Sequence, residues 1–517
     1  MAHFYVAWMP SILLAIDRGT TGSTVVAMDA HGTSVARANH ELPQHFPKPG
    51  WVEHDLNEIY ASVLNALKDV VAQIDIGDVV AIGITNQRET TVVWDRKTGE
   101  PVHRAIVWQD RRTADRCAQL RADGCSELVQ QRSGLVLDPY FSGTKVEWIL
   151  DHVDGARRRA DNGELLFGTI DSWLIHKLTG SEAHLTDSTN ASRTMLFDIH
   201  RLQWDDDLLS MLRVPRSMLP SVVGSAESLG VTRGVPGLPD GIPITGVAGD
   251  QQAALFGQTC FDVGQAKCTY GTGAFLLMNT GNTPYVSENG LLTTVAWTLS
   301  GKTTYALEGS AFIAGAAVQW LRDGLGVIRS SADIETLAKT VENTGEVTFV
   351  PALSGLGAPY WDPHARGLLC GLSRDTNVGH IARATLEGIA FQIVDLVSAM
   401  TLDAGISISR LRADGGAANN EVLMQFQSNV LNVDIDRPAS VETTALGAAY
   451  LAGLGAGFFR DLNAIINAHR IEQSFSPQMD DVTRGFHVQK WRLAVERARL
   501  EMGTTKNGTN NDRRGTG

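Results

Sequence analysis

The feature that most constrains the fold of this chain is a strand–turn–strand unit that occurs twice, in residues 12–29 and in residues 266–279. The first unit reads ILLAIDRGTTGSTVVAMD, and its apolar runs have the aliphatic and β-branched make-up of buried strands. The second unit reads AKCTYGTGAFLLMN and again places glycine and threonine between apolar runs. Two such units, roughly half a chain apart, predict two similar domains that face each other.

Both turns are richer in glycine and hydroxyl groups than a chain reversal requires. A hairpin that only turned the chain would need one Asn-Gly or Asp-Gly pair. The first turn instead contains Gly19, Thr20, Thr21, Gly22, Ser23 and Thr24. Successive backbone N–H groups in such a turn form a concave site for an anion. The alternative is a polar hairpin that binds no ligand. Because a second copy of the unit exists, the hypothesis that the two hairpins hold a polyphosphate from both sides of a cleft is equally favoured.

The rest of the chain predicts an α/β protein, because its 517 residues exceed the usual size of one hydrophobic core and alternate strand-like and helix-like segments. Residues 79–86 are expected to form a buried strand. Residues 243–258 are expected to form a strand, a glycine-rich turn and a helix, and residues 411–431 a strand, two glycines and a helix. We place one domain in residues 1–256 and a second in residues 257–495, each with one hairpin. The tail, residues 496–517, has no hydrophobic pattern and is expected to be disordered.

Composition argues against several classes of function. The net charge of −13 disfavours a general nucleic-acid binder, because attraction to phosphate chains needs a basic face. The five cysteines are odd in number and scattered, without a Cys-x-x-Cys pair, which favours a reducing cytoplasm over a disulfide framework or a zinc site. No apolar run reaches the roughly 18 residues that a membrane span requires, so no membrane insertion is expected.

Two aspartates have positions that suit phosphoryl transfer to a hydroxyl, which needs positioned phosphates, a metal ion and a carboxylate that takes a proton. Asp250 follows a predicted strand and a glycine and stands at the N-cap of the next helix, where it fits the base. Plain helix capping is the alternative. Asp17 ends the first strand beside the first hairpin and fits a magnesium ligand, with a turn-initiating role as the alternative. The common nucleotide signatures GxxxxGK[ST] and GxGxxG are absent.

A group of charged and aromatic residues suits the acceptor of the phosphoryl group. The segments TNQRET, VWQDRR and LDPYFSGTKVEW contribute Arg88, Glu89, Trp108 and Tyr140. A small polyol needs charged partners for its hydroxyls and an aromatic face for its C–H edge. Surface salt bridges together with core aromatics are the alternative.

Two long motifs resemble signatures of the carbohydrate kinase family that includes glycerol kinase, xylulokinase and gluconokinase. They are YFSGTKVEWILD at 140–151 and GLLCGLSRDTNVGHIARATLEG at 367–388, and matches run in order from about residue 12 to about residue 460. Within that family, TNQRET, VWQDRRT, GVAGDQQAALFGQ, TYGTGAFLLMNTG and LSGLGAPYWDPHARG look most like the glycerol kinases. The resemblance implies two ribonuclease-H-like domains of the sugar kinase and actin type, with an interdomain cleft that closes on ATP, Mg²⁺ and glycerol. It also implies a homo-oligomer, either a dimer or a tetramer.

The same resemblance assigns roles residue by residue. It implies that Asp250 is the catalytic base. From their positions beside the first hairpin and at the strand end, Asp17 and Asp250 are the expected metal ligands. Contacts to the glycerol hydroxyls fall on Arg88, Glu89, Tyr140, Asp250 and Gln251, and the apolar wall falls on Trp108 and Phe275. Contacts to the nucleotide fall on Thr20, Thr21, Gly22, Thr272, Gly315, Gln319, Gly416 and Asn420.

Several positions depart from the family pattern. The glycerol kinases usually read Asp-Gln-Gly-Thr-Thr-Ser-Ser-Arg at the first hairpin, whereas Arg18 replaces the glutamine here and Thr24 the arginine. The family arginine helps to hold the nucleotide phosphates, so a second possibility is that Arg18 restores this charge from another position. Gly241 stands where the enteric enzymes that fructose 1,6-bisphosphate inhibits carry an arginine, which implies that this inhibition does not operate here. A kinase for another small polyol or ketose, and a degenerate ATP-binding sensor, are the alternatives.

Overall fold

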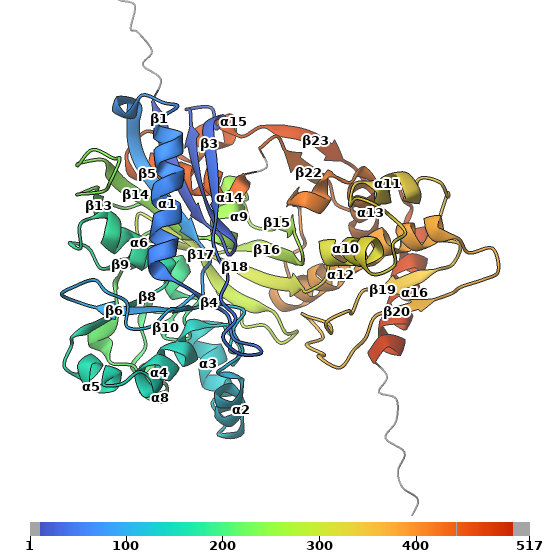
Figure 1. The fold of residues 1–517 in the computed structure, drawn as a ribbon. Helices are drawn as coiled ribbons and strands as arrows, with labels where there is room; N and C mark the ends of the chain where they lie inside the picture. The colour runs from blue at the N-terminus through green and yellow to red at the C-terminus, as the bar shows by residue number, and fades with distance from the viewer. Residues whose placement is uncertain (1–10, 441, 500–517) are drawn as a thin grey trace, which may run out of the picture.

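The computed structural model describes residues 11–440 and 442–499. Two β-sheets, each with helices against it, make up two lobes that lie side by side (Figure 1). The last helix, α16 (Asp481–Arg499), extends into the segment that the sequence predicted to be a disordered tail, so that prediction is wrong for residues 496–499. The remainder of the predicted tail lies outside the described residues.

The first lobe contains a six-stranded sheet in the order β13-β14-β5-β1-β2-β3. Its strands are β1 (Ile12–Arg18), β2 (Gly22–Met28), β3 (Ser34–Glu41), β5 (Val79–Asn86), β13 (Gly230–Val231) and β14 (Pro243–Gly249). β1, β2 and β3 are antiparallel neighbours, whereas β5 pairs parallel with both β1 and β14. Apolar side chains of these strands share a buried core with α1 (Leu56–Val71) and α6 (Ile170–Leu178).

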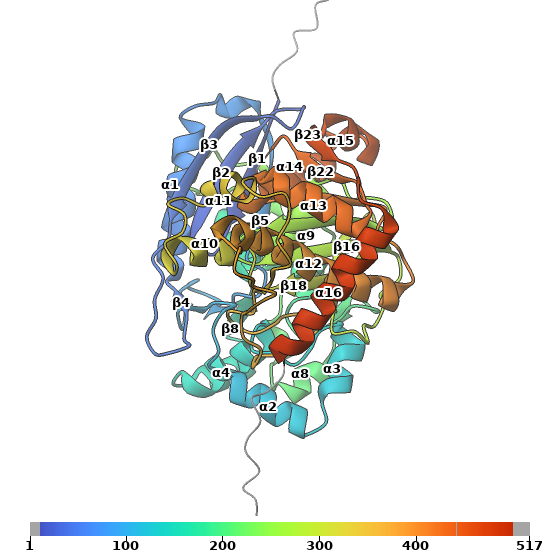
Figure 2. The same cartoon turned by 90° about the vertical axis from the view of Figure 1, so that its right-hand side faces the viewer.

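The second lobe contains a seven-stranded sheet in the order β17-β18-β16-β15-β21-β22-β23. Its strands are β15 (Gln265–Tyr270), β16 (Ala274–Gly281), β17 (Leu292–Leu299), β18 (Lys302–Ala311), β21 (Arg410–Asp414), β22 (Ile435–Pro438) and β23 (Ile471–Phe475). The helices α10 (Gly315–Asp323), α12 (Val378–Ala404), α13 (Glu421–Leu431) and α16 belong to this lobe and lie toward the viewer in Figure 2.

Both sheets follow one plan, which confirms the predicted α/β class with two similar units. In each sheet three antiparallel strands are followed by two parallel ones: β3-β2-β1 with β5 and β14, and β18-β16-β15 with β21 and β22. The two predicted hairpins both form, since residues 19–21 join β1 to β2 and residues 271–273 join β15 to β16. The buried strand predicted at 79–86 is β5.

The predicted segments differ from the structure in two details. β14 passes directly into α9 (Asp250–Gly257), so no separate glycine-rich turn exists there, and Gly249 rather than Asp250 is the N-cap. Asp250 is therefore the first helical residue. A short 3₁₀ helix, Gly416–Asn419, stands between β21 and α13, and Asn420 caps α13 by accepting a hydrogen bond from the Leu423 N–H at 2.9 Å.

Shorter elements connect the two cores and complete both lobes. The strands are β4 (Glu53–His54), β6 (Val92–Asp95), β7 (Ala105–Ile106), β8 (Leu165–Gly168), β9 (Leu185–Asp187), β10 (Phe197–Asp198), β11 (Gln203–Trp204), β12 (Ser221–Val223), β19 (Thr348–Val350) and β20 (Leu368–Cys370). The helices are α2 (Ala114–Ala122), α3 (Ser126–Ser133), α4 (Ser142–His152), α5 (Ala156–Asp161), α7 (Ser188–Ala191), α8 (Asp206–Met211), α11 (Asp333–Ala338) and α15 (Leu462–Ala468). Two further 3₁₀ helices span Ile76–Asp78 and Arg216–Met218.

One helix of the described chain, α12, is long and apolar enough to cross a membrane by length and composition. The expectation from the sequence concerned an unbroken apolar run, and α12 has none of about 18 residues, since Arg383, Glu387 and Asp395 interrupt it. Because 78% of the apolar 18-residue stretch of α12 is buried inside the protein, α12 has the environment of a core helix.

Helix α14 (Thr443–Gly455) comes late in the sequence but packs against β1, β5, β14 and α9 of the first lobe. The contact brings backbone against backbone. A Cβ built on Gly447 would lie 1.8 Å from the Ala253 carbonyl oxygen, and one built on Gly83 would lie 2.1 Å from the Ala448 carbonyl oxygen. Glycine is therefore required on both sides of the contact, and α14 fixes the position of the helix that begins at Asp250.

Replacing Gly447 with alanine should destabilise the protein by about 1–3 kcal/mol or more and lower activity, because the added methyl group must separate α14 from α9. Chemical denaturation together with steady-state kinetics measures both effects. Gly485→Ala in α16 is the matched control, since a Cβ there meets no atom within 4 Å. This control should keep activity unchanged and should be neutral or slightly stabilising. Equal behaviour of the two variants would contradict the close-contact argument.

Candidate active site

The carboxyl ends of three parallel strands, β1, β5 and β14, meet at one edge of the first sheet. Asp17 of β1 is paired with Thr85 of β5, and Gly249 of β14 is paired with Asn86. The residues that follow these strand ends, including Arg88 and Asp250, are therefore neighbours. Ligands in α/β folds bind at such an edge.

A buried network of two arginines and two glutamates forms the base of this edge. Arg88 Nη1 and Nη2 donate to the two carboxylate oxygens of Glu308 at 2.6 and 2.9 Å. Arg193 Nε donates to Glu89 Oε1 at 2.8 Å, and its Nη2 donates to Glu308 Oε1 at 3.1 Å. All four side chains are at most 3% exposed. Burial of such charges is tolerated only when they are paired and hydrogen-bonded, as they are here.

The network fixes the charge of its members. Burial alone would raise the pKa of the Glu308 carboxyl, but Arg193 and Arg88 outweigh it and lower that pKa to about 2. Burial alone would lower the pKa of the Arg88 guanidinium, but Glu308 and Glu89 raise it further above its ordinary value. Arg88 Nε has no hydrogen-bond partner among the described residues, although it lies 3.2 Å from Asp250 Oδ1. The network thus holds a buried N–H donor beside Asp250. An oxygen atom of a ligand can accept a hydrogen bond from it.

Asp250 is the member of the site that faces open space. Its side chain is 30% exposed, and its Oδ1 accepts a hydrogen bond from the Gln251 N–H at 2.7 Å. Burial raises the pKa of the Asp250 carboxyl, and the negative charge of Glu89 adds to this effect against the opposing charge of Arg88. A carboxylate with a raised pKa is a better proton acceptor than an ordinary aspartate.

Aromatic residues stand beside the network on the first lobe. The rings of Trp108 and Tyr140 meet edge to face with centroids 5.4 Å apart. Burial, followed by the charge of Glu89, raises the pKa of the Tyr140 hydroxyl, which therefore remains protonated. Lys145 Nζ donates to the Tyr140 carbonyl at 2.7 Å and holds the backbone there. Trp108 Nε1 donates to Thr20 Oγ1 at 2.9 Å, so the first hairpin is tied to this aromatic pair.

The second lobe contributes side chains to the same region through β15, β16 and β18. Lys267 of β15 donates from Nζ to Gln251 Oε1 and, at 3.0 Å, to Thr269 Oγ1. Phe275 is paired with Thr269 on one side and with Ser310 on the other. Side chains of paired strand residues share a face, and Glu308 lies two residues from Ser310. Phe275 is therefore on the sheet face that carries Glu308 and Lys267.

Asp17 fits a ligand for a hard cation. Its carboxylate accepts no hydrogen bond within the described part of the chain, which leaves its oxygens available. Burial raises the pKa of Asp17 to about 7, and the charges of Asp250 and Glu442 add to this effect. Since a cation would relieve the repulsion between Asp17 and Asp250, this pair suits Mg²⁺. The described residues contain no group of three or more His, Cys, Asp or Glu side chains that could hold a metal.

The first hairpin is held by contacts with the loop that follows β3. Leu42 N–H donates to the Thr21 carbonyl at 2.8 Å, and Gln44 Nε2 donates to the Thr20 carbonyl at 2.8 Å. Gly22 leaves no room for a side chain, because a Cβ there would lie 2.7 Å from the His40 carbonyl oxygen. Residues 20–22 thus occupy a defined turn at the end of β1, beside Asp17.

Arg18 and Thr24 of this hairpin have different surroundings. Arg18 is fully buried and points away from the solvent, with Nη1 3.3 Å from the Gly22 carbonyl and Nη2 3.4 Å from His54 Nδ1. Arg18 therefore supports the turn from its buried side. Its charge is not presented at the exposed surface of the turn. Thr24 Oγ1 accepts a hydrogen bond from Asn39 Nδ2 at 2.8 Å on the neighbouring strand.

A cavity of about 390 Å³ lies in the second lobe at the second hairpin. All five nucleotide candidates of this half of the chain line it: Thr272, Gly315, Gln319, Gly416 and Asn420. The hairpin is docked on the start of α10, since the Gly315 N–H donates to the Gly271 carbonyl at 2.9 Å. A Cβ on Gly315 would lie 2.6 Å from that same oxygen. The cavity thus combines a glycine-threonine turn with two helix starts, an arrangement that suits a nucleotide.

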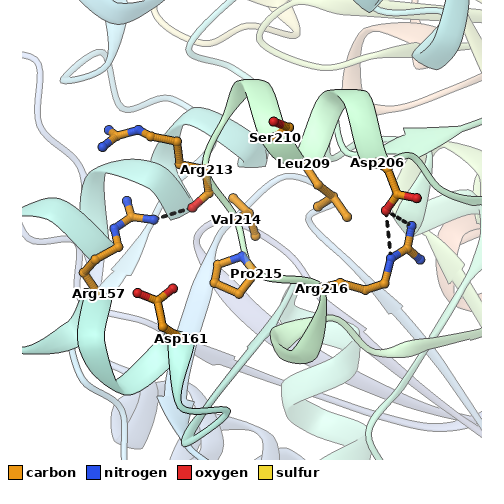
Figure 3. Close-up of a pocket in the computed structure, with 9 residues that line it drawn as sticks. All are labelled: Arg157, Asp161, Asp206, Leu209, Ser210, Arg213, Val214, Pro215 and Arg216. Atoms are coloured by element: carbon orange, nitrogen blue, oxygen red, sulfur yellow. Dashed lines mark hydrogen bonds and ion pairs between the residues drawn. The ribbon is translucent and has the colours of Figure 1, made fainter.

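A second, shallower pocket of about 540 Å³ lies on the surface between α5 and α8 (Figure 3). Its arginines are already paired, because Arg216 Nη2 lies 2.6 Å from Asp206 Oδ1 and Arg157 Nη2 lies 2.7 Å from Asp151 Oδ1. The strand-end residues described above do not line this pocket, which therefore has no part in the candidate site.

Sequence reasoning missed Glu308, Arg193 and Lys267. The available signal was a charge within an apolar strand: Glu308 interrupts YALEGSAF, and Lys267 interrupts QAKCTY. Charged residues are rarely buried unless they are paired, so an acid in such a run indicates a buried partner elsewhere. The identity of that partner depends on tertiary contacts that a single strand does not reveal.

Comparisons with known proteins agree with this arrangement. Residues 12–257 match the N-terminal domain of the FGGY family of carbohydrate kinases, and residues 266–456 match its C-terminal domain. The glycerol kinase of Myxococcus xanthus is 58% identical over 492 residues, covering 94% of this chain and 99% of that protein. The glycerol kinase of Carboxydothermus hydrogenoformans is 54% identical over 489 residues, covering 94% and 98%. The crystal structure of Plasmodium falciparum glycerol kinase with ADP superimposes with a TM-score of 0.91 at 38% identity, covering 95% of this chain and 99% of that one.

Proposed function

This chain belongs to the FGGY family of carbohydrate kinases, and on that premise we propose that it catalyses the ATP-dependent phosphorylation of glycerol to sn-glycerol 3-phosphate. The observation that carries this proposal is the position of Asp250. A partly exposed carboxylate with a raised pKa stands beside the buried donor of Arg88, at the strand edge where a ligand is expected. The relatives named above, at more than half identity over nearly the whole chain, support glycerol as the acceptor.

In the proposed mechanism Asp250 accepts the proton of a terminal glycerol hydroxyl while that oxygen attacks the γ-phosphorus of ATP. The bond between the γ-phosphorus and the oxygen that bridges to the β-phosphate breaks, and ADP leaves. The products are glycerol 3-phosphate, ADP and one proton. A positioned base contributes roughly 10²- to 10⁴-fold in rate, and correct placement of the two substrates contributes much of the remainder.

The other candidate residues position the acceptor. Arg88, Glu89, Tyr140 and Gln251 offer hydrogen bonds to the glycerol hydroxyls, while Trp108 and Phe275 form the apolar wall along its C–H edge. The Glu308–Arg193 part of the network holds Arg88 and Glu89 in place. A buried site that is built to bond hydroxyls rejects analogues without them by up to about 10⁴- to 10⁵-fold, because its polar groups are left unpaired.

In this proposal the nucleotide contacts both hairpins. The cavity of the second lobe takes the adenosine end through Gly315, Gln319, Gly416 and Asn420, and Thr272 lies at the phosphates. Thr20, Thr21 and Gly22 hold the phosphates from the first lobe. Asp17 and Asp250 would hold Mg²⁺, which when bound neutralises charge on the phosphate oxygens.

The remaining expectations follow from the same premise. We propose residues 1–256 and 257–495 as the two kinase domains, with α14 of the second packed on the first. We also propose a homo-oligomer, a dimer or a tetramer, located in the cytoplasm, where the free thiols of the five cysteines are maintained.

The experiment that tests the acceptor is ADP release with Mg-ATP, measured across glycerol, dihydroxyacetone, erythritol, xylulose and no acceptor. We expect turnover that depends on glycerol and little turnover without an acceptor. Turnover with another polyol or ketose alone would keep the kinase and overturn glycerol. ATP binding without turnover on any acceptor would favour the sensor and would implicate the altered first hairpin, in particular Thr24.

A further inference from the structure

Lys267 of β15 is a buried cation that reaches from the second sheet to the start of α9, where Gln251 follows the proposed base Asp250. Its Nζ donates to Gln251 Oε1 and, at 3.0 Å, to Thr269 Oγ1. Lys267 is fully buried, and no carboxylate of the described chain lies within ion-pair distance of its ammonium group. A buried ammonium group is costly unless it is hydrogen-bonded. The bond to the Gln251 amide oxygen is therefore one that the folded protein has reason to keep.

This bond determines how the Gln251 amide is oriented. An ammonium group has three donors and no acceptor, so it binds the oxygen of the amide and leaves the nitrogen for another partner. Gln251 Nε2 donates to no residue that the structure describes, and it is accessible to solvent because the side chain of Gln251 is only partly buried. Turning the amide over would place its N–H groups against the ammonium group and would deprive Lys267 of an acceptor. Gln251 thus offers an accessible donor.

A donor at this position complements the groups beside it. Asp250 supplies a carboxylate acceptor, and Arg88 Nε supplies a donor 3.2 Å from Asp250 Oδ1. A hydroxyl group has one hydrogen to donate and can also accept hydrogen bonds. A glycerol hydroxyl that accepts from Gln251 therefore keeps its own hydrogen for a carboxylate. With the amide turned over, the Gln251 oxygen would compete with the carboxylates for that hydrogen.

We propose that Lys267 is a positioning residue for the acceptor substrate, which holds Gln251 with its amide nitrogen directed to a glycerol hydroxyl. The inference rests on the proposed function, since it takes glycerol as the acceptor. It adds a rule of specificity: the hydroxyl at Gln251 is recognised as an acceptor of a hydrogen bond. Because Lys267 belongs to the second sheet and Gln251 to the helix that follows β14, this recognition depends on contact between the two lobes.

Lys267→Met tests the positioning role, because methionine is also unbranched but cannot donate a hydrogen bond. Its KM for glycerol should rise by about 3- to 10-fold, which corresponds to the loss of roughly one hydrogen bond. Its kcat should fall by less, and its KM for ATP should stay unchanged, whereas general damage to the fold would alter all three constants. Lys302→Met, at an exposed lysine at the start of β18, is the matched control and should leave all three unchanged.

Gln251→Glu tests the orientation of the amide without leaving a buried charge unpaired. The carboxylate has the same shape and stays paired with Lys267, but it presents an oxygen in place of the donor. The KM of this variant for glycerol should therefore rise by about tenfold or more. In a double-mutant cycle, Lys267→Met should not raise this KM any further when it is added to Gln251→Met.

The outcomes separate this inference from the proposed function. Wild-type KM for glycerol in Lys267→Met or in Gln251→Glu would overturn the positioning role, and so would additive effects in the double-mutant cycle. In each of these cases glycerol-dependent turnover by the wild type would uphold the kinase. Absence of that turnover in the wild type would overturn the proposed function and this inference together.

Discussion

Replacing Asp250 with asparagine is expected to lower kcat for glycerol-dependent ADP release by about 10²- to 10⁴-fold. The substitution keeps the size of the side chain and removes the proton acceptor. It also removes the negative charge 3.2 Å from Arg88 Nε, so Arg88 remains paired with Glu308 and Glu89. Coupled measurement of ADP release gives kcat, and calorimetric titration gives the affinity for ATP.

The same variant should still bind ATP, because the adenosine cavity of the second lobe does not include Asp250. Asp262→Asn is the matched control, since this exposed aspartate in the connection after α9 only accepts a hydrogen bond from Gln265 Nε2 at 3.0 Å. Its kcat should equal that of the wild type. If Asp250→Asn retained kcat within about tenfold of the wild type, Asp250 would not be the base.

Replacing Glu308 with glutamine is expected to destabilise the folded protein by about 3–5 kcal/mol, since it leaves the buried charges of Arg88 and Arg193 without their shared carboxylate. Activity should fall together with stability, because Arg88 loses the partner that fixes its guanidinium. Chemical denaturation gives the free energy of unfolding. Glu182→Gln is the matched control: its ion pair with Arg233 has both side chains more than half exposed, and its loss should change the free energy of unfolding by no more than about 1 kcal/mol.

The contribution of Glu308 should depend on pH with a definite sign. The folded-state pKa of this carboxyl, about 2, lies below the ordinary value of 4.5. Its stabilisation is therefore fully present above about pH 4.5 and is lost as the pH falls toward 2. The difference in unfolding free energy between the wild type and Glu308→Gln should shrink across that range. A difference that stays constant between pH 5 and pH 3 would contradict the assigned pKa.

Local patterns in the sequence predicted much of the fold. The two hairpins and the strand at residues 79–86 were predictable because apolar runs and glycine-rich turns act through near neighbours. The placement of Asp250 at a strand end followed from the same signals, although its position as the first helical residue rather than the N-cap did not. The choice between these positions depends on how abruptly α9 leaves the sheet.

The buried ion network was not predictable in this way. Glu308 meets Arg88 across 220 residues and Arg193 across 115, and no local pattern links residues so far apart. The surroundings of Arg18 show the same limit. The sequence alone left open that this arginine replaces a missing charge at the nucleotide, whereas its contacts with Gly22 and His54 place it beneath the turn.

The position of α14 has a consequence for the order in which the chain folds. The apolar cluster that joins β1 and β2 to α9 also contains residues 445–452 of α14, and these are made only after most of the second lobe. During synthesis the face of the first sheet on which α14 packs therefore stays uncovered until nearly nine-tenths of the chain has emerged. Contacts between residues so far apart in the sequence slow folding. The two lobes are thus not independent folding units, and the helix that positions Asp250 acquires its final support last.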